Sequence, residues 1–295
     1  MVAVPCFNRG SIRVPTHTGR PFQLRSHAGF LIAGILIGAL AVWIIDRGPR
    51  HIDLTALPKP TRVERPCDPS SSRTAIILVH GQSNAANFGS SRYAARGAVD
   101  NFDPESGKCF AAVDPLLGAD GAGGNFATRL GDILIDAGRY DRVVIVPIGV
   151  QGASLSELNG EYGERIDNAL RKLRAAQLTP THLLFQQGEK DAILTTSRDQ
   201  YVSMLHALVM RFRAAGLQAP FYLSRSTKCD VEGPKNSAAI RAAQEAAVDV
   251  ALNIRRGPDT DVIGNEGRNP LDGCHMNEAG TLANAALWAT FMDQP

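Results

Sequence analysis

Short apolar runs alternate along the chain with longer segments in which apolar residues recur at helical spacing. The apolar runs cover 74–79, 142–149, 182–185 and 221–224, with a weaker run at 261–263. Helical spacing marks 125–138, 164–177 and 197–215, and alanine-rich segments follow at 237–253 and 278–292. Strands separated by single helices predict parallel pairing with right-handed crossovers. We therefore expect a three-layer α/β domain with a five-stranded parallel sheet. The segment 87–124 is rich in Gly, Ala and Asp without a clear period, which predicts a long functional loop.

An apolar stretch near the start of the chain runs from Ala28 to Ile45 without a charge. A helix of this length spans roughly 27 Å, close to the hydrocarbon thickness of a bilayer. Trp43 lies near one end, and four arginines but no acidic residue precede the stretch. This pattern predicts a cytoplasmic basic tail at 1–27 and a single-pass signal anchor at 28–45. An extended linker at 46–72, with five prolines, would then lead to a catalytic domain at 73–295.

Two other interpretations of this stretch stay open. Residues 39–41 read Ala-Leu-Ala and fit a cleavage site, which would make the protein secreted. The stretch also fits a buried core helix. An anchor would hold the domain at the inner (cytoplasmic) membrane, on the side away from the cytoplasm. In a Gram-negative cell, the domain would then lie in the periplasm.

The charge balance separates the two ends of the protein. The overall net charge of +2 combines six arginines and one acidic residue in 1–50 with a mildly acidic remainder of net charge −3. Such a body is a poor phosphate binder, so nucleic acid is not expected as a partner. The chain is 44% hydrophobic and 20% charged, which is ordinary for a globular protein.

Four of the five cysteines follow the apolar stretch, while Cys6 precedes it. An even set on the exported side permits two disulfides, although spacing alone does not choose among the three pairings. We favour Cys229 with Cys274, because they would lie in adjacent loops if the fourth and fifth strands are neighbours. Four free buried thiols are the alternative.

Four polar segments fall at or just after predicted strand ends. They are Gly81–Asn84, Gly149–Ser154, Gln187–Asp191 and Asp272–His275. Since the carboxyl ends of parallel strands form one rim, and ligands bind there, these segments are expected to meet. Gly81 permits a sharp turn after the first strand, and the N–H groups at the start of a following helix can stabilise an oxyanion.

A serine, a histidine and an aspartate in these segments suit nucleophilic catalysis. Asp272 and His275 are three residues apart, so the carboxylate can hold one ring nitrogen while the other takes the Ser83 proton. Taken singly, Ser83 fits a helix cap, and the Asp272–His275 pair fits a surface turn. Their joint occurrence with the two middle segments favours catalysis.

These four segments resemble the successive blocks of the SGNH (GDSL-type) hydrolases, and most closely the sialate O-acetylesterase-like branch with its carbohydrate acetylesterases. The resemblance covers about 74–292. It implies a flavodoxin-like sheet, no metal and no cofactor. It also implies Ser83 as nucleophile, His275 as general base and then acid, and Asp272 as orienting carboxylate. The Ser83 N–H, the Gly152 N–H and the Gln187 side-chain amide would form the oxyanion hole, with Gln82, Asn84 and Glu189 as supporting residues.

Three positions depart from the family pattern. Gln151 replaces the first of two frequent glycines, Gln186 replaces a frequent histidine or tyrosine, and Lys190 replaces a small residue. Glu189 and Asp191 are expected to brace their loop rather than bind metal. The Cys and His spacing fits no zinc site, and no phosphate-binding loop is apparent.

The sequence as a whole predicts a membrane-anchored, outward-facing serine esterase that removes acetyl or other small acyl groups from a carbohydrate. Two alternatives stay open. One is an O-acyltransferase that uses the same three residues to acylate a sugar. The other is a non-catalytic glycan-binding protein of the cell envelope. The complete set of Ser83, Asp272 and His275 disfavours a pure binding role.

Overall fold

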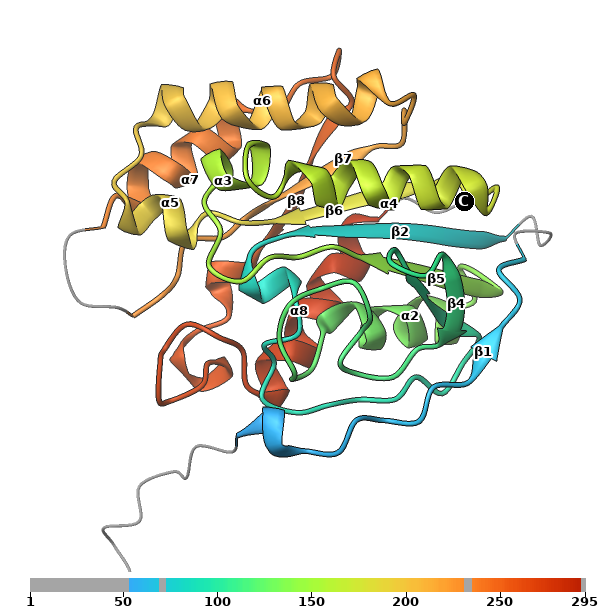
Figure 1. The fold of residues 1–295 in the computed structure, drawn as a ribbon. Helices are drawn as coiled ribbons and strands as arrows, with labels where there is room; N and C mark the ends of the chain where they lie inside the picture. Colours follow the sequence, from blue (N-terminus) through green and yellow to red (C-terminus); the bar gives the residue numbers. More distant parts are fainter. Residues whose placement is uncertain (1–52, 69–72, 231–234, 293–295) are drawn as a thin grey trace, which may run out of the picture. The chain divides into compact units, whose positions relative to one another are not determined.

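A mixed eight-stranded sheet with the strand order β1-β4-β3-β5-β2-β6-β7-β8 forms the centre of the protein (Figure 1). The computed structural model describes residues 53–68, 73–230 and 235–292. The strands are β1 Glu64–Arg65, β2 Thr74–Gly81, β3 Val99–Asp103, β4 Lys108–Ala111, β5 Arg142–Pro147, β6 His182–Gln186, β7 Phe221–Arg225 and β8 Ile254–Asp259. Along this order, neighbours from β3 to β8 pair in parallel, whereas β4 pairs antiparallel with both β3 and β1. The order β5-β2-β6-β7-β8 is that of a flavodoxin-like sheet.

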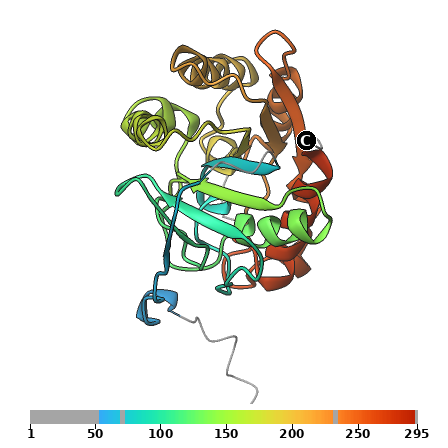
Figure 2. The ribbon, with the colours of Figure 1, turned by 90° about the vertical axis from the view of Figure 1, so that its right-hand side faces the viewer.

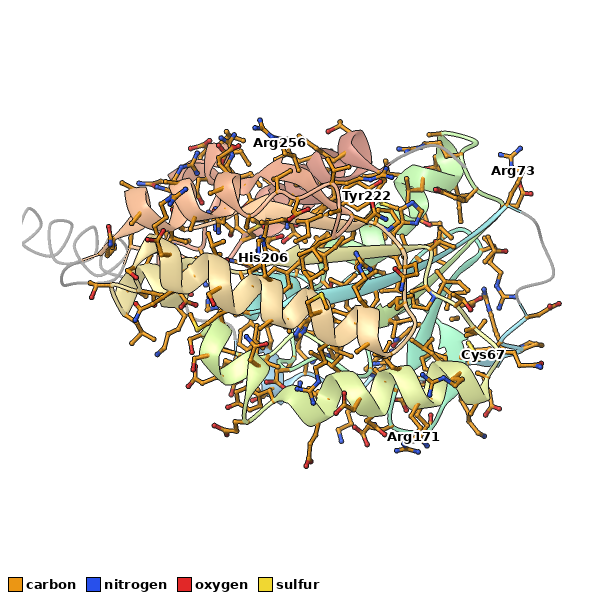
Figure 3. The ribbon with its side chains drawn as sticks, turned by 90° about the horizontal axis from the view of Figure 1, so that it is seen from above. Cys67, Arg73, Arg171, His206, Tyr222 and Arg256 are labelled. Atoms are coloured by element: carbon orange, nitrogen blue, oxygen red, sulfur yellow. A yellow bond between two sulfur atoms is a disulfide. The ribbon has the colours of Figure 1, made fainter. Side chains whose placement is uncertain are left out.

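Helices cover both faces of this sheet. They are α2 Phe126–Asp136, α3 Leu155–Asn159, α4 Gly163–Ala175, α5 Glu189–Ile193, α6 Arg198–Ala214, α7 Ser237–Ala246 and α8 Glu278–Phe291. The helices α3, α4, α6 and α7 pack on one face, and α2 and α8 pack on the other (Figures 1 and 2). Figure 3 shows α4, with Arg171, running beside α6, with His206. Three layers were predicted, and the α/β fold is confirmed.

The alternation along β2 shows how one strand serves both layers. Ile76 and Leu78 belong to the apolar core under α4 and α6, while Ala75, Ile77 and Val79 belong to the core under α2 and α8. Successive side chains of a strand point to opposite faces of the sheet. A strand that is buried on both faces therefore forms a nearly continuous apolar run. This run is why β2 could be predicted from the sequence.

The prediction of five parallel strands was wrong in two places. The segment 261–263 is no strand, because Thr260–Val262 forms a 3-10 turn (η3) in which the Asp259 carboxylate accepts the Asp261 N–H. The fifth strand of the flavodoxin-like order is β8, which lies at the sheet edge and reads Ile-Arg-Arg-Gly-Pro-Asp, so it lacks an apolar run.

The predicted loop at 87–124 contains the hairpin of β3 and β4, which extends the sheet beyond β5. Its polar residues obscured the strand pattern. Asp100 is buried in β3, where it pairs with Arg142 at 2.6 Å and Arg65 at 3.3 Å. Buried Asn101 accepts the Leu117 N–H at 2.6 Å. A buried polar side chain with its partners satisfied is compatible with a sheet but invisible to hydrophobic periodicity.

The described part of the expected linker is attached to the domain. Strand β1 pairs with β4, Arg62 donates to the carbonyl of Val113, and Cys67 forms a disulfide with Cys109. Residues 1–52, which include the predicted tail, the predicted span at 28–45 and Cys6, lie outside the described residues. None of the helices that the structure describes is long and apolar enough to cross a bilayer.

We expect the double variant Cys67→Ser/Cys109→Ser to lose stability and keep its catalytic geometry. The bridge closes a loop over a sequence separation of 42 residues, so its loss should lower the free energy of unfolding by about 2–4 kcal/mol. Urea denaturation of both proteins under non-reducing conditions measures the change. An unchanged denaturation midpoint would contradict this role for the bridge.

Candidate active site

The turn after β2 places Ser83 beside the end of β6. Gly81 pairs with Gln186, and the Gln82 N–H donates to the Gln186 carbonyl at 3.1 Å. A Cβ atom at Gly81 would lie 2.0 Å from that carbonyl oxygen, and the φ of Gly81 is +134°. Only glycine allows this close approach with this backbone conformation. Ser83 then begins a single 3-10 turn, η2, Ser83–Ala85, where a longer helix was expected.

Ser83 is not a helix cap. Gln82 occupies the capping position of η2, and no side chain caps this turn. Ser83 is buried, with 3% of its surface exposed. Its Oγ has no hydrogen-bond partner among the described residues. The Oγ does not belong to the side-chain polar atoms that are both unpartnered and cut off from solvent, so solvent can reach it. The Ser83 hydroxyl is therefore a candidate nucleophile, next to backbone N–H groups that the first turn leaves without internal partners.

The structure brings Asp272 and His275 into direct contact. Asp272 Oδ2 lies 2.8 Å from His275 Nδ1, and Asp272 Oδ1 accepts the N–H groups of Cys274 and His275 at 2.9 Å each. Burial acts to raise the pKa of the Asp272 carboxyl, but the hydrogen bonds from His275 and from the two N–H groups outweigh it, so this pKa lies below its ordinary value. An ionised carboxylate thus orients the imidazole and leaves Nε2 for another partner.

Asn84 links the Ser83 turn to the His275 loop. Its Nδ2 donates to Glu189 Oε1 at 2.9 Å and to the Cys274 carbonyl at 3.3 Å. The same carbonyl accepts a hydrogen bond from Arg268 Nη1 at 2.7 Å. The peptide that precedes His275 is therefore held from both sides. No hydrogen bond joins Ser83 to His275 in the described part of the chain; in ligand-free enzymes such contacts often tighten only when substrate binds.

Two residues that support the site, Arg268 and Ser226, were not predicted from the sequence. Arg268 is buried and also donates to the carbonyls of Thr260 and Ile263. Ser226 donates its hydroxyl to Glu189 Oε1 at 2.9 Å. Gln82 Oε1 accepts the N–H groups of Gly188 at 3.3 Å and Lys190 at 3.1 Å. Neither Arg268 nor Ser226 belongs to a motif, and only the folded chain brings them to the rim.

A disulfide closes the loop that carries the histidine. Cys274, which lies between Asp272 and His275, is bonded to Cys229 after β7. The predicted Cys229–Cys274 pair is confirmed, and both residues are buried. The loop that follows β7 is therefore covalently joined to the segment that bears the catalytic candidates.

Phe88 lies against the imidazole of His275. Their ring centroids are 5.0 Å apart with an interplanar angle of 23°. A Cβ atom at Gly121 would lie 2.7 Å from the Phe88 ring, so the ring also approaches that glycine backbone closely. Asp272 fixes one edge of the imidazole, and Phe88 fixes one face.

We expect Phe88→Ala to lower kcat/KM for ester hydrolysis by about tenfold, because a stacked pair is worth about 0.5–1.5 kcal/mol and the imidazole would gain freedom. Steady-state kinetics on a small acetyl ester measures this effect. Phe88→Tyr retains the ring face and should stay close to the wild type. Equal losses in both variants would argue against the stacking role.

Gly152 lies in the exposed loop between β5 and α3. Its φ is +59°, and the preceding Gln151 donates its N–H to Asp120 Oδ2 at 2.9 Å. After the loop, Ser154 and Glu157 form a capping box that starts α3. Both ends of the loop are therefore held, and the Gly152 N–H joins the N–H groups of the Ser83 turn as a candidate oxyanion donor.

The structure gives the Gln187 amide a different use from an oxyanion donor. Gln187 is buried, and its Nε2 donates to the Ala153 carbonyl at 3.2 Å and to Asp191 Oδ2 at 2.6 Å. Its Oε1 accepts the Tyr201 hydroxyl at 3.0 Å. Both amide hydrogens are thus occupied. Asp191 also accepts the Leu155 N–H at 2.8 Å, so this pair ties the start of α5 to the loop after β5.

Another histidine near the rim is unsuited to proton transfer. His80, at the end of β2, has its Nδ1 3.1 Å from the Ile148 carbonyl and packs against Phe185. Burial lowers the pKa of His80 to about 4, so its ring is neutral at physiological pH. Within the described residues, no group of three or more His, Cys, Asp or Glu side chains is arranged to hold a metal ion.

Comparison with known families gives one match that covers most of the chain. The model described as "Carbohydrate esterase, sialic acid-specific acetylesterase" matches residues 73–290. This range includes all four segments of the site. No curated protein sequence matches the chain.

Three solved structures are similar to this chain at low sequence identity. A protein from Arabidopsis thaliana is 14% identical, with a TM-score of 0.59 over 74% of this chain and 96% of its own. NanS is 15% identical, with a TM-score of 0.49 over 74% and 94%. A carbohydrate acetylesterase from Xanthomonas citri is 17% identical, with a TM-score of 0.46 over 73% and 55%.

Proposed function

Because the chain belongs to the carbohydrate esterase, sialic acid-specific acetylesterase family, and is thus a carboxylic ester hydrolase, we propose that it removes acetyl or other small acyl groups from a carbohydrate through Ser83, His275 and Asp272. The observation that carries the proposal is the Asp272–His275 pair, held against the Ser83 turn by Asn84.

In the proposed reaction, His275 Nε2 removes the proton from Ser83 Oγ as that oxygen attacks the ester carbonyl carbon. Asp272 holds the opposite ring nitrogen and stabilises the imidazolium that forms. The N–H groups of Ser83 and Gly152 bind the oxyanion of the tetrahedral intermediate, each donor contributing about 3–4 kcal/mol. The bond to the sugar oxygen then breaks, and His275 returns the proton to this leaving group.

The second half of the reaction repeats these roles with water. His275 removes a proton from a water molecule, which attacks the acyl carbon attached to Ser83. The same N–H groups bind the second oxyanion, and collapse releases the carboxylic acid and restores the serine hydroxyl. An acceptor sugar in place of water would make the protein an O-acyltransferase.

The test is acetate release by the full-length chain from O-acetylated sialic acid and from acetylated neutral oligosaccharides. We expect release from at least one of these substrates without added metal. Product analysis in the presence of an unacetylated acceptor sugar distinguishes hydrolysis from transfer. A chain that binds acetylated glycans and releases no acyl product from any of them would refute the proposed function.

We also propose that the domain works outside the cytoplasm, anchored through the apolar stretch at 28–45. The support is the sequence pattern of that stretch, together with two disulfides in the domain, since such bonds persist in oxidising compartments. Protease accessibility of the domain in spheroplasts, with the membrane fraction as the expected location, tests this proposal. Protection of the domain until the membrane is dissolved would overturn it.

A further inference from the structure

Asp120, in the segment between β4 and α2, contacts both the loop after β5 and helix α4. Its Oδ2 accepts the Gln151 N–H at 2.9 Å, and its Oδ1 accepts an N–H of Arg165 at 2.7 Å. The Asp120 N–H donates to the Gly149 carbonyl at 3.0 Å, and Arg165 Nη1 approaches the same carbonyl at 3.3 Å. The Asp120 carboxylate thus binds the N–H of Gln151, and the Arg165 guanidinium binds the carbonyl of Gly149.

Gly152, which follows this backbone, makes no side-chain packing contact. Gln151 and Gly152 are both exposed, and a Cβ atom at Gly152 would meet nothing within 4 Å. Packing therefore does not fix the direction of the Gly152 N–H. On the side before Gly152, the hydrogen bonds to Gly149 and Gln151 orient the chain, and the bond from Gln151 to Asp120 is strengthened by the charge of its acceptor. On the side after it, Gln187 holds the Ala153 carbonyl.

The same aspartate also reaches the Ser83 turn. The Asp120 carbonyl accepts the Asn87 N–H at 2.9 Å, just after η2. One residue thus connects the chain that follows the nucleophile with the loop that carries Gly152. The contact to Asn87 is made by the backbone, so a change of the Asp120 side chain leaves it in place and affects the loop after β5 and the ion pair with Arg165.

We infer that Asp120, held by Arg165, is a positioning residue that sets the direction of the Gly152 N–H toward the oxyanion formed at Ser83. This inference rests on the proposed function. A donor displaced by about 1 Å can cost up to about 100-fold in rate, because its interaction is realised only when the oxyanion forms. The loss should therefore appear in kcat and leave KM nearly unchanged.

The experiment compares Asp120→Ala and Arg165→Gln with a matched control from the same helix. Asp167 in α4 pairs with Arg211 of α6 at 2.5 Å and does not contact the loop after β5, so Asp167→Asn removes an ion pair without disturbing that loop. Kinetics with p-nitrophenyl acetate and the rate of inactivation by a fluorophosphonate are measured for each full-length protein. Thermal unfolding verifies that each variant is folded.

We expect kcat and the inactivation rate to fall together by about 10- to 100-fold in Asp120→Ala and by a smaller factor in Arg165→Gln, while Asp167→Asn stays within about twofold of the wild type. If Asp120→Ala does not fold, Arg165→Gln provides the same comparison. A wild-type kcat in folded Asp120 and Arg165 variants, a loss confined to KM, or an equal loss in Asp167→Asn would overturn the inference. An inactive wild type would instead refute the proposed function.

Discussion

Replacing Ser83 by alanine is expected to abolish ester hydrolysis, with kcat lowered by about 10^6-fold. The reason is that Ser83 Oγ is the proposed attacking atom, and two polar side chains of the described rim are engaged in other contacts. Asn84 is engaged with Glu189, and the Ser226 hydroxyl also donates to Glu189. The change removes one oxygen atom that has no hydrogen-bond partner within the described chain, so the free energy of unfolding should hardly change.

Two measurements test this expectation. The first is turnover of p-nitrophenyl acetate, and the second is labelling by a fluorophosphonate followed by peptide mapping. The label should be found on Ser83 in the wild type and be lost in Ser83→Ala. Ser203→Ala, which changes an exposed serine on α6, is the control and should retain both turnover and label. Full activity of Ser83→Ala would remove the basis of the proposed mechanism.

Asp272→Asn is expected to lower kcat by about 10^3- to 10^4-fold. The asparagine amide would present an N–H to His275 Nδ1, which favours the tautomer whose Nε2 already carries a proton and cannot accept one from Ser83. The control is Asp199→Asn, which changes an exposed carboxylate on α6. Activity of Asp272→Asn within tenfold of the wild type would show that another group orients the histidine.

The Asp272 variant also predicts a pH dependence of stability. Since folding lowers the pKa of Asp272 below its ordinary value of 3.8, the ionised group stabilises the folded state above that pH. This contribution is lost as the pH falls through the folded-state pKa. The difference in thermal midpoint between wild type and Asp272→Asn should therefore be constant near neutral pH and shrink below about pH 4. A difference that grows in acid would contradict this assignment.

The hydrophobic pattern of the sequence identified the four adjacent strands β5, β2, β6 and β7 and all of the long helices. It failed where burial is achieved by polar partners, as for Asp100 and Asn101 in β3, and where an edge strand is only half buried, as in β8. Ser83, Asp272 and His275 were predicted as a site because their residue types carry the chemistry, and the structure brings Asp272 and His275 into contact. The groups that hold them were found less well. Arg268 and Asp120 act through contacts between segments distant in the chain, and no spacing rule indicates such contacts.

Gln187 shows that the position of a residue can be predicted from the sequence while its hydrogen-bond partners are not. Its place in a recognisable block suggested an amide directed at the substrate, whereas Asp191 and Ala153 take both of its hydrogens. A side-chain amide has two donors, and their direction depends on neighbours in the folded chain. The residue type was therefore informative about where Gln187 lies, and much less informative about what it binds.

The disulfide between Cys229 and Cys274 makes the conformation of the segment from Asp272 to His275 depend on the oxidation of two cysteines. A newly synthesised chain in a reducing compartment carries these two sulfurs as thiols, so the segment from Asp272 to His275 lacks its covalent link to the neighbouring loop. We expect the esterase to become fully competent only once this disulfide has formed, so that reduced protein has a lower kcat than oxidised protein.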